Sequence, residues 1–242
     1  MPIPRIHCDL RLGPGAQFTL PDDAAQHVAK SLRLKAGDAL VVFDGRGGEY
    51  DATIQRIDRD RVDVKVGAFR DVEREAPFAL GLVQGLPEAD KMDWIIQKAT
   101  ELGTAWIQPV TCERSVVRLS GDRAARREAH WRRVAVAAAE QCGRTRIPDV
   151  RPTLGFLSWL AVPAETPRWM LAPGAEPIAA QPSAPSPLEL VVGPEGGFSE
   201  RERLLLVDHG CTAVSLGPRV LRTETAPVAA LAAIHALWGD FR

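Results

Sequence analysis

The sequence predicts an α/β protein in two parts, and three observations lead to that prediction. Residues 1–72 contain short apolar runs separated by turns, with one helical stretch. From residue 78 onward buried strands alternate with amphipathic helices, which is typical of an α/β domain with a mostly parallel sheet. Between these parts, RDVEREAP (residues 70–77) is polar and ends in proline, which marks a domain boundary. We therefore predict two domains, 1–72 and 73–242.

The N-terminal part is expected to form a small β-barrel with one helix. In ALVVFDGRGGEYDATIQRI, two apolar runs flank a glycine-rich turn, which is a hairpin signal. In RVDVKVGAF, Val62, Val64 and Val66 alternate with polar residues and indicate a half-buried strand. PDDAAQHVAKSLRL is the helical stretch.

The C-terminal part is expected to alternate strands and helices to its end. Helices are predicted for ADKMDWIIQKATELG, DRAARREAHWRRVAVAAAEQCGR, SERERLLLVDHG and TETAPVAALAAIHALWG, and strands for FALGLVQGL, TAWIQPV, RWMLA, LELVVG and TAVSLG. Met92, Ile95, Ile96, Ala99 and Leu102 share one face of the first helix, and Gly103 is expected to end it. Ser199 and Glu202 have the spacing of a capping box. APGAEPIAAQPSAPSP (172–187) is expected to be a loop or a poorly ordered surface segment.

Composition excludes several classes of protein. The 242 residues carry a net charge of −1, so any binding of nucleic acid must depend on how the charges are distributed. Four cysteines without motif spacing predict reduced thiols in a cytoplasmic protein. No apolar segment fits a signal peptide or a membrane span, and the five scattered histidines do not predict a metal site.

Two glycine-rich loops are the best candidates for a ligand site. In LVVGPEGGFSERE (190–202) a buried strand ends in a loop with almost no side chains, and a helix follows at once. Backbone amides in such a loop can approach a ligand closely at the carboxyl edge of the sheet. A tight turn without a ligand would have the same sequence. Neither a Walker phosphate loop nor a Rossmann G-x-G-x-x-G is present.

The second loop, in SLGPRVLRTETAPVAAL (215–231), also ends a strand in Gly-Pro and leads into a helix. Two successive units of this kind indicate one shared pocket. Together the two loops resemble those of the SPOUT methyltransferases, in particular the family that methylates N3 of uridine in 16S ribosomal RNA. KMDWIIQKATELGTAWIQPV and WRRVAVAAAEQCGRTRIPDV are similar to that family's middle segments, and HVAKSLRLKAGDALVVFDGRGGEY resembles its PUA-like RNA-binding barrel.

The resemblance implies a C-terminal trefoil knot, a homodimer and S-adenosylmethionine as cofactor. It places the cofactor between two walls. The first wall is Gly193, Pro194, Glu195, Gly196 and Gly197, and the second is Leu216, Gly217, Arg219, Val220, Leu221 and Thr225. Leu216, Val220 and Leu221 suit an adenine ring, and a cationic methyl donor does not require a phosphate-binding lysine, which neither loop contains.

Methylation of uridine N3 requires removal of the N3 proton and charge stabilisation on the base. Arg222 is the candidate for stabilising the uracil oxygens, and Glu224 is the candidate proton acceptor. The alternative interpretation makes Arg222 and Glu224 a structural ion pair, with Thr223 and Thr225 as helix caps.

The RNA substrate, either 16S rRNA or the assembled small ribosomal subunit, needs a basic surface. The candidate RNA contacts are His27, Lys30, Arg33, Lys35, Arg114, Arg118, Glu140, Gln141 and Arg144. The resemblance favours a place near the pocket for Glu140, Gln141 and Arg144. An ordinary solvated helix face is the alternative for the arginine-rich helix. Two other functions stay open: a SPOUT methyltransferase acting on tRNA or a ribose hydroxyl, and a non-catalytic RNA-binding assembly factor.

Overall fold

The computed structural model describes residues 3–59, 61–88, 90–163 and 166–241. The chain divides into two compact units. The N-terminal unit comprises the residues up to Glu75 together with Ala139–Ile147, and the C-terminal unit comprises Ala76–Ala138 and the residues from Pro148 onward.

The N-terminal unit is built on a five-stranded sheet with the order β1-β3-β4-β5-β2. Its strands are β1 (Arg5–His7), β2 (Gln17–Thr19), β3 (Ala39–Phe43), β4 (Glu49–Asp58) and β5 (Arg61–Arg70). The predicted hairpin is confirmed, because β3 and β4 pair antiparallel with Val41 opposite Asp51. The predicted helix is a short α1 (Asp22–Gln26) that continues as a π-helical turn, η1 (His27–Ser31).

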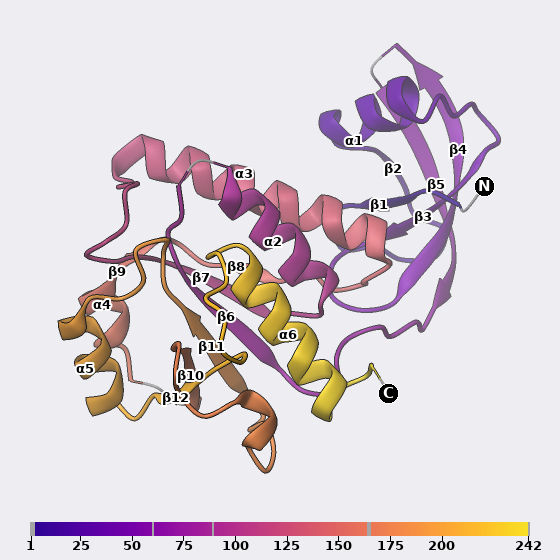
Figure 1. The fold of residues 1–242 in the computed structure, drawn as a ribbon. Helices are drawn as coiled ribbons and strands as arrows, with labels where there is room; N and C mark the ends of the chain where they lie inside the picture. Colours follow the sequence, from indigo (N-terminus) through magenta and orange to yellow (C-terminus); the bar gives the residue numbers. More distant parts are fainter. Residues whose placement is uncertain (1–2, 60, 89, 164–165, 242) are drawn as a thin grey trace. The chain divides into compact units, whose positions relative to one another are not determined.

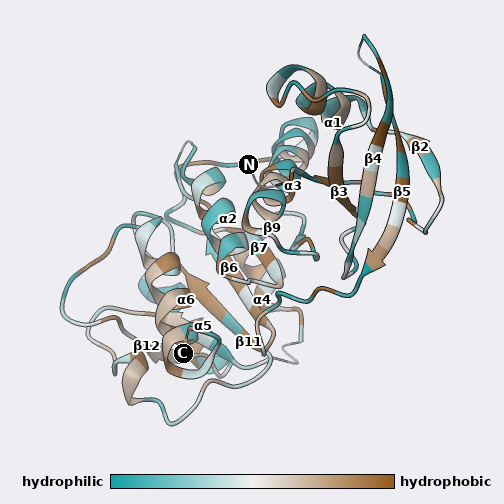
Figure 2. Ribbon diagram, turned by 90° about the vertical axis from the view of Figure 1, so that its right-hand side faces the viewer, coloured by the Kyte–Doolittle hydropathy of each residue, from teal (hydrophilic) through white to brown (hydrophobic). Residues whose placement is uncertain are grey.

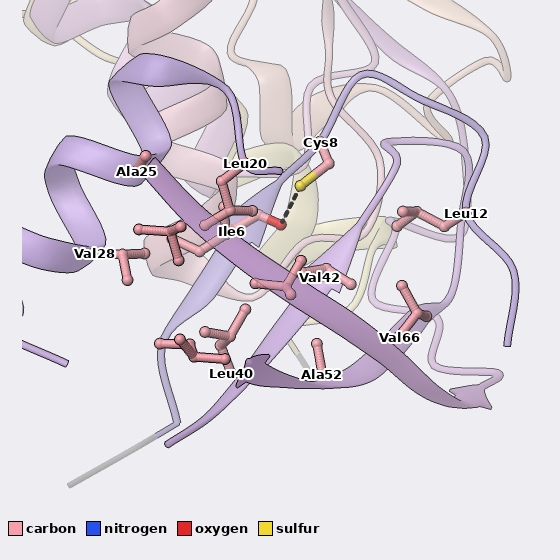
Figure 3. Close-up of a cluster of buried hydrophobic side chains, with 13 residues drawn as sticks. Ile6, Cys8, Leu12, Leu20, Ala25, Val28, Leu40, Val42, Ala52 and Val66 are labelled. Carbon is pink, nitrogen blue, oxygen red and sulfur yellow. Dashed lines mark hydrogen bonds between the residues drawn. The ribbon is translucent and has the colours of Figure 1, made fainter. Parts of the chain in front are cut away.

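One face of this sheet carries the core of the N-terminal unit. The predicted alternation along β5 is confirmed, because Val62, Val64 and Val66 are all buried. They pack in one cluster with residues of β1, β3, β4 and α1 (Figure 3). The Cys8 thiol belongs to this cluster, and burial raises its pKa to about 12. A buried thiol of this kind is inert, in agreement with a structural role.

Residues 139–147 complete the N-terminal unit from far along the chain. The backbone N–H of His7 donates to Glu140 Oε1 at 2.8 Å. The guanidinium of Arg144 pairs with Glu75, and Arg46 forms a β-bridge with Arg146. These contacts fix the segment through polar groups that a pattern of hydrophobic residues does not reveal.

The C-terminal unit contains the predicted parallel sheet. The path β12-β10-β11-β6-β7-β8 is parallel at every pairing, and β9 pairs with the end of β7. Its strands are β6 (Leu80–Gly85), β7 (Trp106–Thr111), β8 (Asp149–Val150), β9 (Leu154–Gly155), β10 (Arg168–Leu171), β11 (Leu188–Val192) and β12 (Thr212–Val214). β6 and β11 are buried along their whole length, which explains why they consist of Leu, Val and Gly apart from the buried Gln84 and Glu189.

Helices cover both faces of the sheet (Figure 1). α2 (Lys91–Glu101) and α6 (Thr225–Trp238) lie side by side on one face. On the other face, α4 (Phe156–Leu160) and α5 (Glu200–Asp208) pack on a cluster that includes Val83 and Val191. α3 (Gly121–Cys142) alternates hydrophobic and hydrophilic residues along its length (Figure 2). A short 3-10 helix, η2 (Ile178–Ala180), precedes β11.

Several local predictions are confirmed. Met92, Ile95, Ile96 and Ala99 are the buried face of α2. Ser199 accepts from the backbone N–H of Glu202, and Glu202 accepts from that of Ser199, so the capping box at α5 is complete. The segment 172–187 is a loop apart from η2, and its Pro177 bridges to Ser215 just after β12.

Candidate functional site

The principal pocket lies at the carboxyl ends of β10, β11 and β12, where ligands bind in open parallel sheets. Its volume of about 600 Å³ lies within the rough range of 300–1,000 Å³ that is usual for small-molecule sites. Two segments form most of the wall: residues 193–198, here the first loop, and residues 215–224, here the second loop. Leu171, Ala172 and Pro173, after β10, complete that side.

The first loop owes its shape to missing side chains. Gly197 has a φ of +65° and donates its N–H to Pro194 O at 2.8 Å. A Cβ on Gly193 would lie 3.1 Å from Phe198 N. Below the loop, a Cβ on Gly85 at the end of β6 would lie 2.6 Å from Pro194 Cδ. The loop is therefore pressed against the sheet at a distance that only glycine allows.

Side chains from other elements hold the first loop from outside. Arg114 lines the pocket and donates to Gly196 O at 2.9 Å. The Glu195 carboxylate accepts from the backbone N–H of Glu88 at 2.9 Å and from Lys91 Nζ at 2.7 Å. Burial alone would raise the pKa of Glu195, but these hydrogen bonds outweigh it and lower that pKa. Glu195 therefore stays ionised at neutral pH.

A hydroxyl joins the two loops at their base. Thr223 is buried, and its Oγ1 donates to Gly193 O at 2.7 Å. The same oxygen accepts from Gln84 Nε2 at 3.2 Å. The alternative role of Thr223 as a helix cap is wrong, because α6 begins at Thr225 with Glu224 as N-cap and has no side-chain cap. Thr223 instead connects the second loop to the end of β11.

The second loop is more open. Gly217 turns the chain with a φ of +96°, and Val220 is 80% exposed although it lines the pocket. The Arg222 side chain is exposed and forms no ion pair with any residue that the structure describes. The predicted alternative of an Arg222–Glu224 pair is therefore wrong. The nearest cation to Glu224 Oε2 is Lys91 Nζ at 3.9 Å.

Comparisons with known proteins agree with this geometry. Residues 74–235 match the family model described as an RNA methyltransferase domain, and residues 20–67 match that of an RNA methyltransferase PUA domain. The chain belongs to this family of RNA methyltransferases. The family resemblance predicted from the two loops is therefore confirmed.

Named relatives of this methyltransferase cover almost its whole length. The ribosomal RNA small subunit methyltransferase E of Bacillus subtilis is 33% identical over 90% of this chain and 89% of its own. A putative methyltransferase of Legionella pneumophila, solved with bound S-adenosylmethionine, is 35% identical with a TM-score of 0.96 over 100% of both chains. The ribosomal RNA small subunit methyltransferase E of Neisseria gonorrhoeae, solved with S-adenosylmethionine, is 35% identical with a TM-score of 0.92 over 99% of this chain and 100% of its own.

In this RNA methyltransferase the pocket brings together nearly all of the predicted cofactor residues. The pocket-lining members of that set are Gly193, Pro194, Glu195, Gly196, Gly197, Leu216, Gly217, Arg219, Val220 and Leu221. Both predicted catalytic residues, Arg222 and Glu224, line it as well. Thr225 does not, and it is exposed at the first position of α6.

The predicted RNA contacts are more widely distributed. Arg114 lines the main pocket, whereas Arg118 borders a smaller hollow of about 320 Å³ beside α4 and α5. In the N-terminal unit the candidates on η1 and the turn after it are all exposed, namely His27, Lys30, Arg33 and Lys35.

Glu140, Gln141 and Arg144 do not line the pocket; they belong to the N-terminal unit. Burial raises the pKa of Glu140, while the hydrogen bond from the His7 N–H opposes that shift. Arg144 is buried against Glu75. The physical reason for their location is that the last turn of α3 packs with the first 75 residues.

The sequence analysis missed Lys91, Gln84 and Arg203. Lys91 and Arg203 line the pocket, and Gln84 lies at its base. Lys91 follows β6, the neighbour of β11, so its strand-to-helix connection ends at the same edge of the sheet. The rule that ligands bind at the carboxyl ends of parallel strands, applied to β6, would have identified Lys91. Among the described residues, no cluster of metal-ligating side chains occurs, and no helix is long and apolar enough to cross a membrane.

Proposed function

We propose that this RNA methyltransferase transfers the methyl group of S-adenosylmethionine to N3 of a specific uridine in 16S ribosomal RNA of the small ribosomal subunit. The observation that carries the proposal is the pocket between the two Gly-Pro loops, with Arg222 and Glu224 in its wall. The names of the Bacillus subtilis and Neisseria gonorrhoeae relatives, which act on small-subunit ribosomal RNA, support the substrate class.

The pocket residues fit S-adenosylmethionine. Leu216, Val220 and Leu221 offer apolar contacts for an adenine ring. Cβ atoms on Gly193 and Gly196 would lie 3.1 Å from Phe198 N and 3.0 Å from Arg114 Cβ, so the loop packs tightly at both positions and both favour glycine. When bound, the cofactor supplies an electrophilic methyl group on a sulfonium centre. The carboxylates of Glu195 and Glu224 in the pocket wall suit a cationic methyl donor better than a phosphate.

Arg222 and Glu224 act on the acceptor base. N3 of uridine holds its proton at neutral pH, so that proton must leave as the methyl group is accepted. The Glu224 Oε2 atom is buried and has no hydrogen-bond partner among the described residues, which leaves a lone pair for a proton. The exposed Arg222 guanidinium makes no ion pair with the residues that the structure describes, so it is available to stabilise negative charge on the uracil oxygens.

The two parts of the chain divide the work between RNA binding and catalysis. Residues 1–72 form the RNA-binding barrel, with His27, Lys30, Arg33 and Lys35 on its surface. Residues 73–242, without the segment Ala139–Ile147 that belongs to the N-terminal unit, form the catalytic domain, where Arg114 and Arg118 extend RNA contact outward from the pocket. In this proposal Glu140 and Arg144 shape the barrel, because their side chains are engaged inside that unit.

The enzyme acts in the cytoplasm as a homodimer with a knotted C-terminal segment. The exposed apolar side chain of Phe241, just after α6, supports a contact with a second copy. The parallel placement of β12 beside β10, with the second loop returning next to the first, suits the knot that the family resemblance implies.

The experiment that tests the reaction is methyl transfer in vitro. Purified protein and labelled S-adenosylmethionine are mixed with small subunits or with naked 16S RNA, both from a strain that lacks the gene. The RNA is digested and the labelled nucleoside is identified by mass spectrometry. We expect 3-methyluridine, and a reaction with Arg222→Met provides the matched low-activity control.

The other outcomes select among the alternatives. A 2′-O-methylated nucleoside, or activity on tRNA alone, would replace this proposal with the other SPOUT substrates. Absence of both product and S-adenosylmethionine binding in calorimetry would favour the non-catalytic assembly factor.

A further inference from the structure

Helix α3 carries five arginines, and their contacts divide them into two groups. Arg127 donates to Asp90 Oδ1 at 3.1 Å, and Arg132 Nε donates to Val150 O at 3.3 Å. The other three are exposed and make no ion pair or hydrogen bond with any residue that the structure describes, namely Arg123, Arg126 and Arg133. Two arginines therefore hold the helix in place, and three are available to a partner.

The three available arginines share one face of the helix and are here called the arginine stripe. At about 100° of turn per residue, Arg126 and Arg133 lie within about 20° of each other, and Arg123 lies about 60° from Arg126. With a rise of about 1.5 Å per residue, the stripe is roughly 15 Å long. The small exposed side chains of Ala129 and Ala137 flank it, so an extended chain can lie close to the helix.

The carboxylates of this region leave the arginine stripe positively charged. Glu128 accepts from the backbone N–H of Thr153 at 2.8 Å, and Asp93 Oδ2 lies 2.6 Å from His130 Nε2. Asp122 is exposed in the first turn, where the positive end of the helix dipole favours a carboxylate. One carboxylate beside three guanidinium groups leaves a local excess of positive charge, although the net charge of the chain is −1.

The arginine stripe starts near the pocket in the catalytic unit. Arg114 in the pocket wall and Arg118 precede α3 in the chain. Within the helix, Arg127 is bound to Asp90, whose neighbour in the chain is the pocket residue Lys91 (Figure 1). Arginines thus extend from the wall of the pocket onto α3.

The backbone of an RNA strand fits this surface best. The guanidinium group is planar and always charged, and it matches phosphate oxygens with two parallel hydrogen bonds. A row of cations on a straight helix complements a row of phosphates, and the chain belongs to a family of RNA methyltransferases. We propose that the arginine stripe binds the sugar–phosphate backbone of the substrate RNA near the target uridine, without reading its sequence. This inference rests on the proposed function, because that function supplies the RNA.

The test is the salt dependence of binding to naked 16S RNA from a strain that lacks the gene, measured by filter binding between about 50 and 200 mM KCl. The test variant is Arg126→Gln/Arg133→Gln, because glutamine has a helix propensity close to that of arginine. The matched control is Lys98→Gln/Arg151→Gln, which removes two positive charges from the same unit at residues that each pair with a carboxylate. Thermal melting and calorimetry with S-adenosylmethionine check the fold and the pocket of both variants.

We expect the slope of log affinity against log salt concentration to become less steep by about 1.4 to 1.8 in the test variant, because two phosphate contacts are lost. The ratio of wild-type to variant affinity should then fall roughly 7-fold to 12-fold between 50 and 200 mM KCl. In methyl transfer, KM for the RNA should rise while kcat and the affinity for S-adenosylmethionine keep their wild-type values. The control should retain the wild-type slope, and adding Arg123→Gln to the test variant should reduce the slope further.

Three results would overturn the inference. An unchanged slope in the test variant would make the arginine stripe an ordinary solvated face. An equal change in the control would assign the effect to net charge. An unchanged slope with an altered oligomeric state in gel filtration would assign the stripe to a contact with protein. Failure of the proposed function is distinguishable, because wild-type enzyme would then give no 3-methyluridine, whereas the binding comparison would still decide whether the stripe holds RNA.

Discussion

The two Gly-Pro loops that wall the pocket have similar sequences but are held in different ways. The first loop is pressed onto Gly85, closed by its own Gly197–Pro194 hydrogen bond and held by Arg114 and Lys91. The second loop is joined to the sheet through Thr223 at its end, and between Leu216 and Leu221 no backbone hydrogen bond is made with any described residue.

This difference indicates two separate tasks. A loop whose backbone is fixed by close packing presents its amides at constant positions, which suits a cofactor that is the same in every turnover. A loop with exposed side chains can adjust to a large RNA. Substitutions in the first loop and its supports should therefore lower stability as well as cofactor affinity. In the second loop, substitution of Leu216, Val220 or Leu221 should lower cofactor affinity, and substitution of the exposed Arg222 should lower the rate.

The largest effect is expected at Arg222, in the open loop. Arg222→Met should lower kcat roughly 100-fold to 1,000-fold, as removal of one charge-stabilising donor does in other enzymes. Thermal unfolding should be unchanged, because the side chain is exposed. Single-turnover kinetics and calorimetric melting measure the two quantities. Arg222→Lys is the control, and its rate should lie between those of the wild type and Arg222→Met. A wild-type rate in Arg222→Met would show that Arg222 has no catalytic role.

The next largest effect is expected at Gly85, below the fixed loop. Gly85→Ala places a Cβ 2.6 Å from Pro194 Cδ and 2.7 Å from Pro194 N, so backbone must move. We expect a loss of roughly 1–3 kcal/mol in the free energy of unfolding, measured in urea, and weaker S-adenosylmethionine binding. Gly217→Ala has no atom within 4 Å of its Cβ and should cost only backbone strain, about 1 kcal/mol. Equal affinity losses in both variants would contradict the contrast between the loops.

A third effect is expected at the hydroxyl that joins the loops. Thr223→Val removes the buried hydroxyl that hydrogen-bonds to Gly193 O and Gln84 Nε2. The loss of these two hydrogen bonds should lower the free energy of unfolding by roughly 1–3 kcal/mol. Thr225→Val, two residues on and exposed, should be nearly neutral. Urea unfolding compares the two variants. If Thr225→Val instead weakens S-adenosylmethionine binding, its predicted role in the cofactor site is restored.

The smallest effect concerns the helices after the loops. α5 has a complete capping box, whereas α6 has no side-chain cap. Ser199→Ala should therefore cost about 1 kcal/mol of stability. Ser183→Ala, at an exposed position of the loop before β11, serves as the control and should cost nothing measurable by chemical denaturation. A neutral Ser199→Ala would show that packing alone holds α5.

Local sequence patterns predicted most of the longer elements and one shared pocket at the two Gly-Pro loops, whereas the short α4 and β9 were not predicted. The residues of each wall were assigned from the family resemblance. Alternation at Val62, Val64 and Val66 and the spacing of Ser199 and Glu202 depend on neighbours in the chain, and both predictions are confirmed. The loop residues could be found because strand, Gly-Pro and helix follow one another directly. The family resemblance then added the methyltransferase activity, which periodicity alone does not reveal.

The residues that pattern analysis missed come from elsewhere in the chain. Lys91 is 104 positions from its partner Glu195, and Gln84 is 139 positions from Thr223. Nothing in their own surroundings marks them, because a lysine at the start of a helix and a glutamine in a strand are ordinary. Glu140 and Arg144 were expected near the pocket because of the family resemblance. The helical pattern of α3 continues without a break to Cys142, so nothing in it shows that its last turn belongs to the N-terminal unit.

The boundary inside α3 has a consequence for the order in which the protein is made. Strand β1 is translated well before its partner at Glu140, which follows more than 130 residues later. At roughly 5–20 residues per second, the stretch between Glu75 and Ile147 takes about 4–14 s to synthesise. During that interval the nascent barrel lacks the acceptor for the His7 N–H and the partner of Glu75. The N-terminal unit is thus completed only after the first strands of the catalytic sheet have been made.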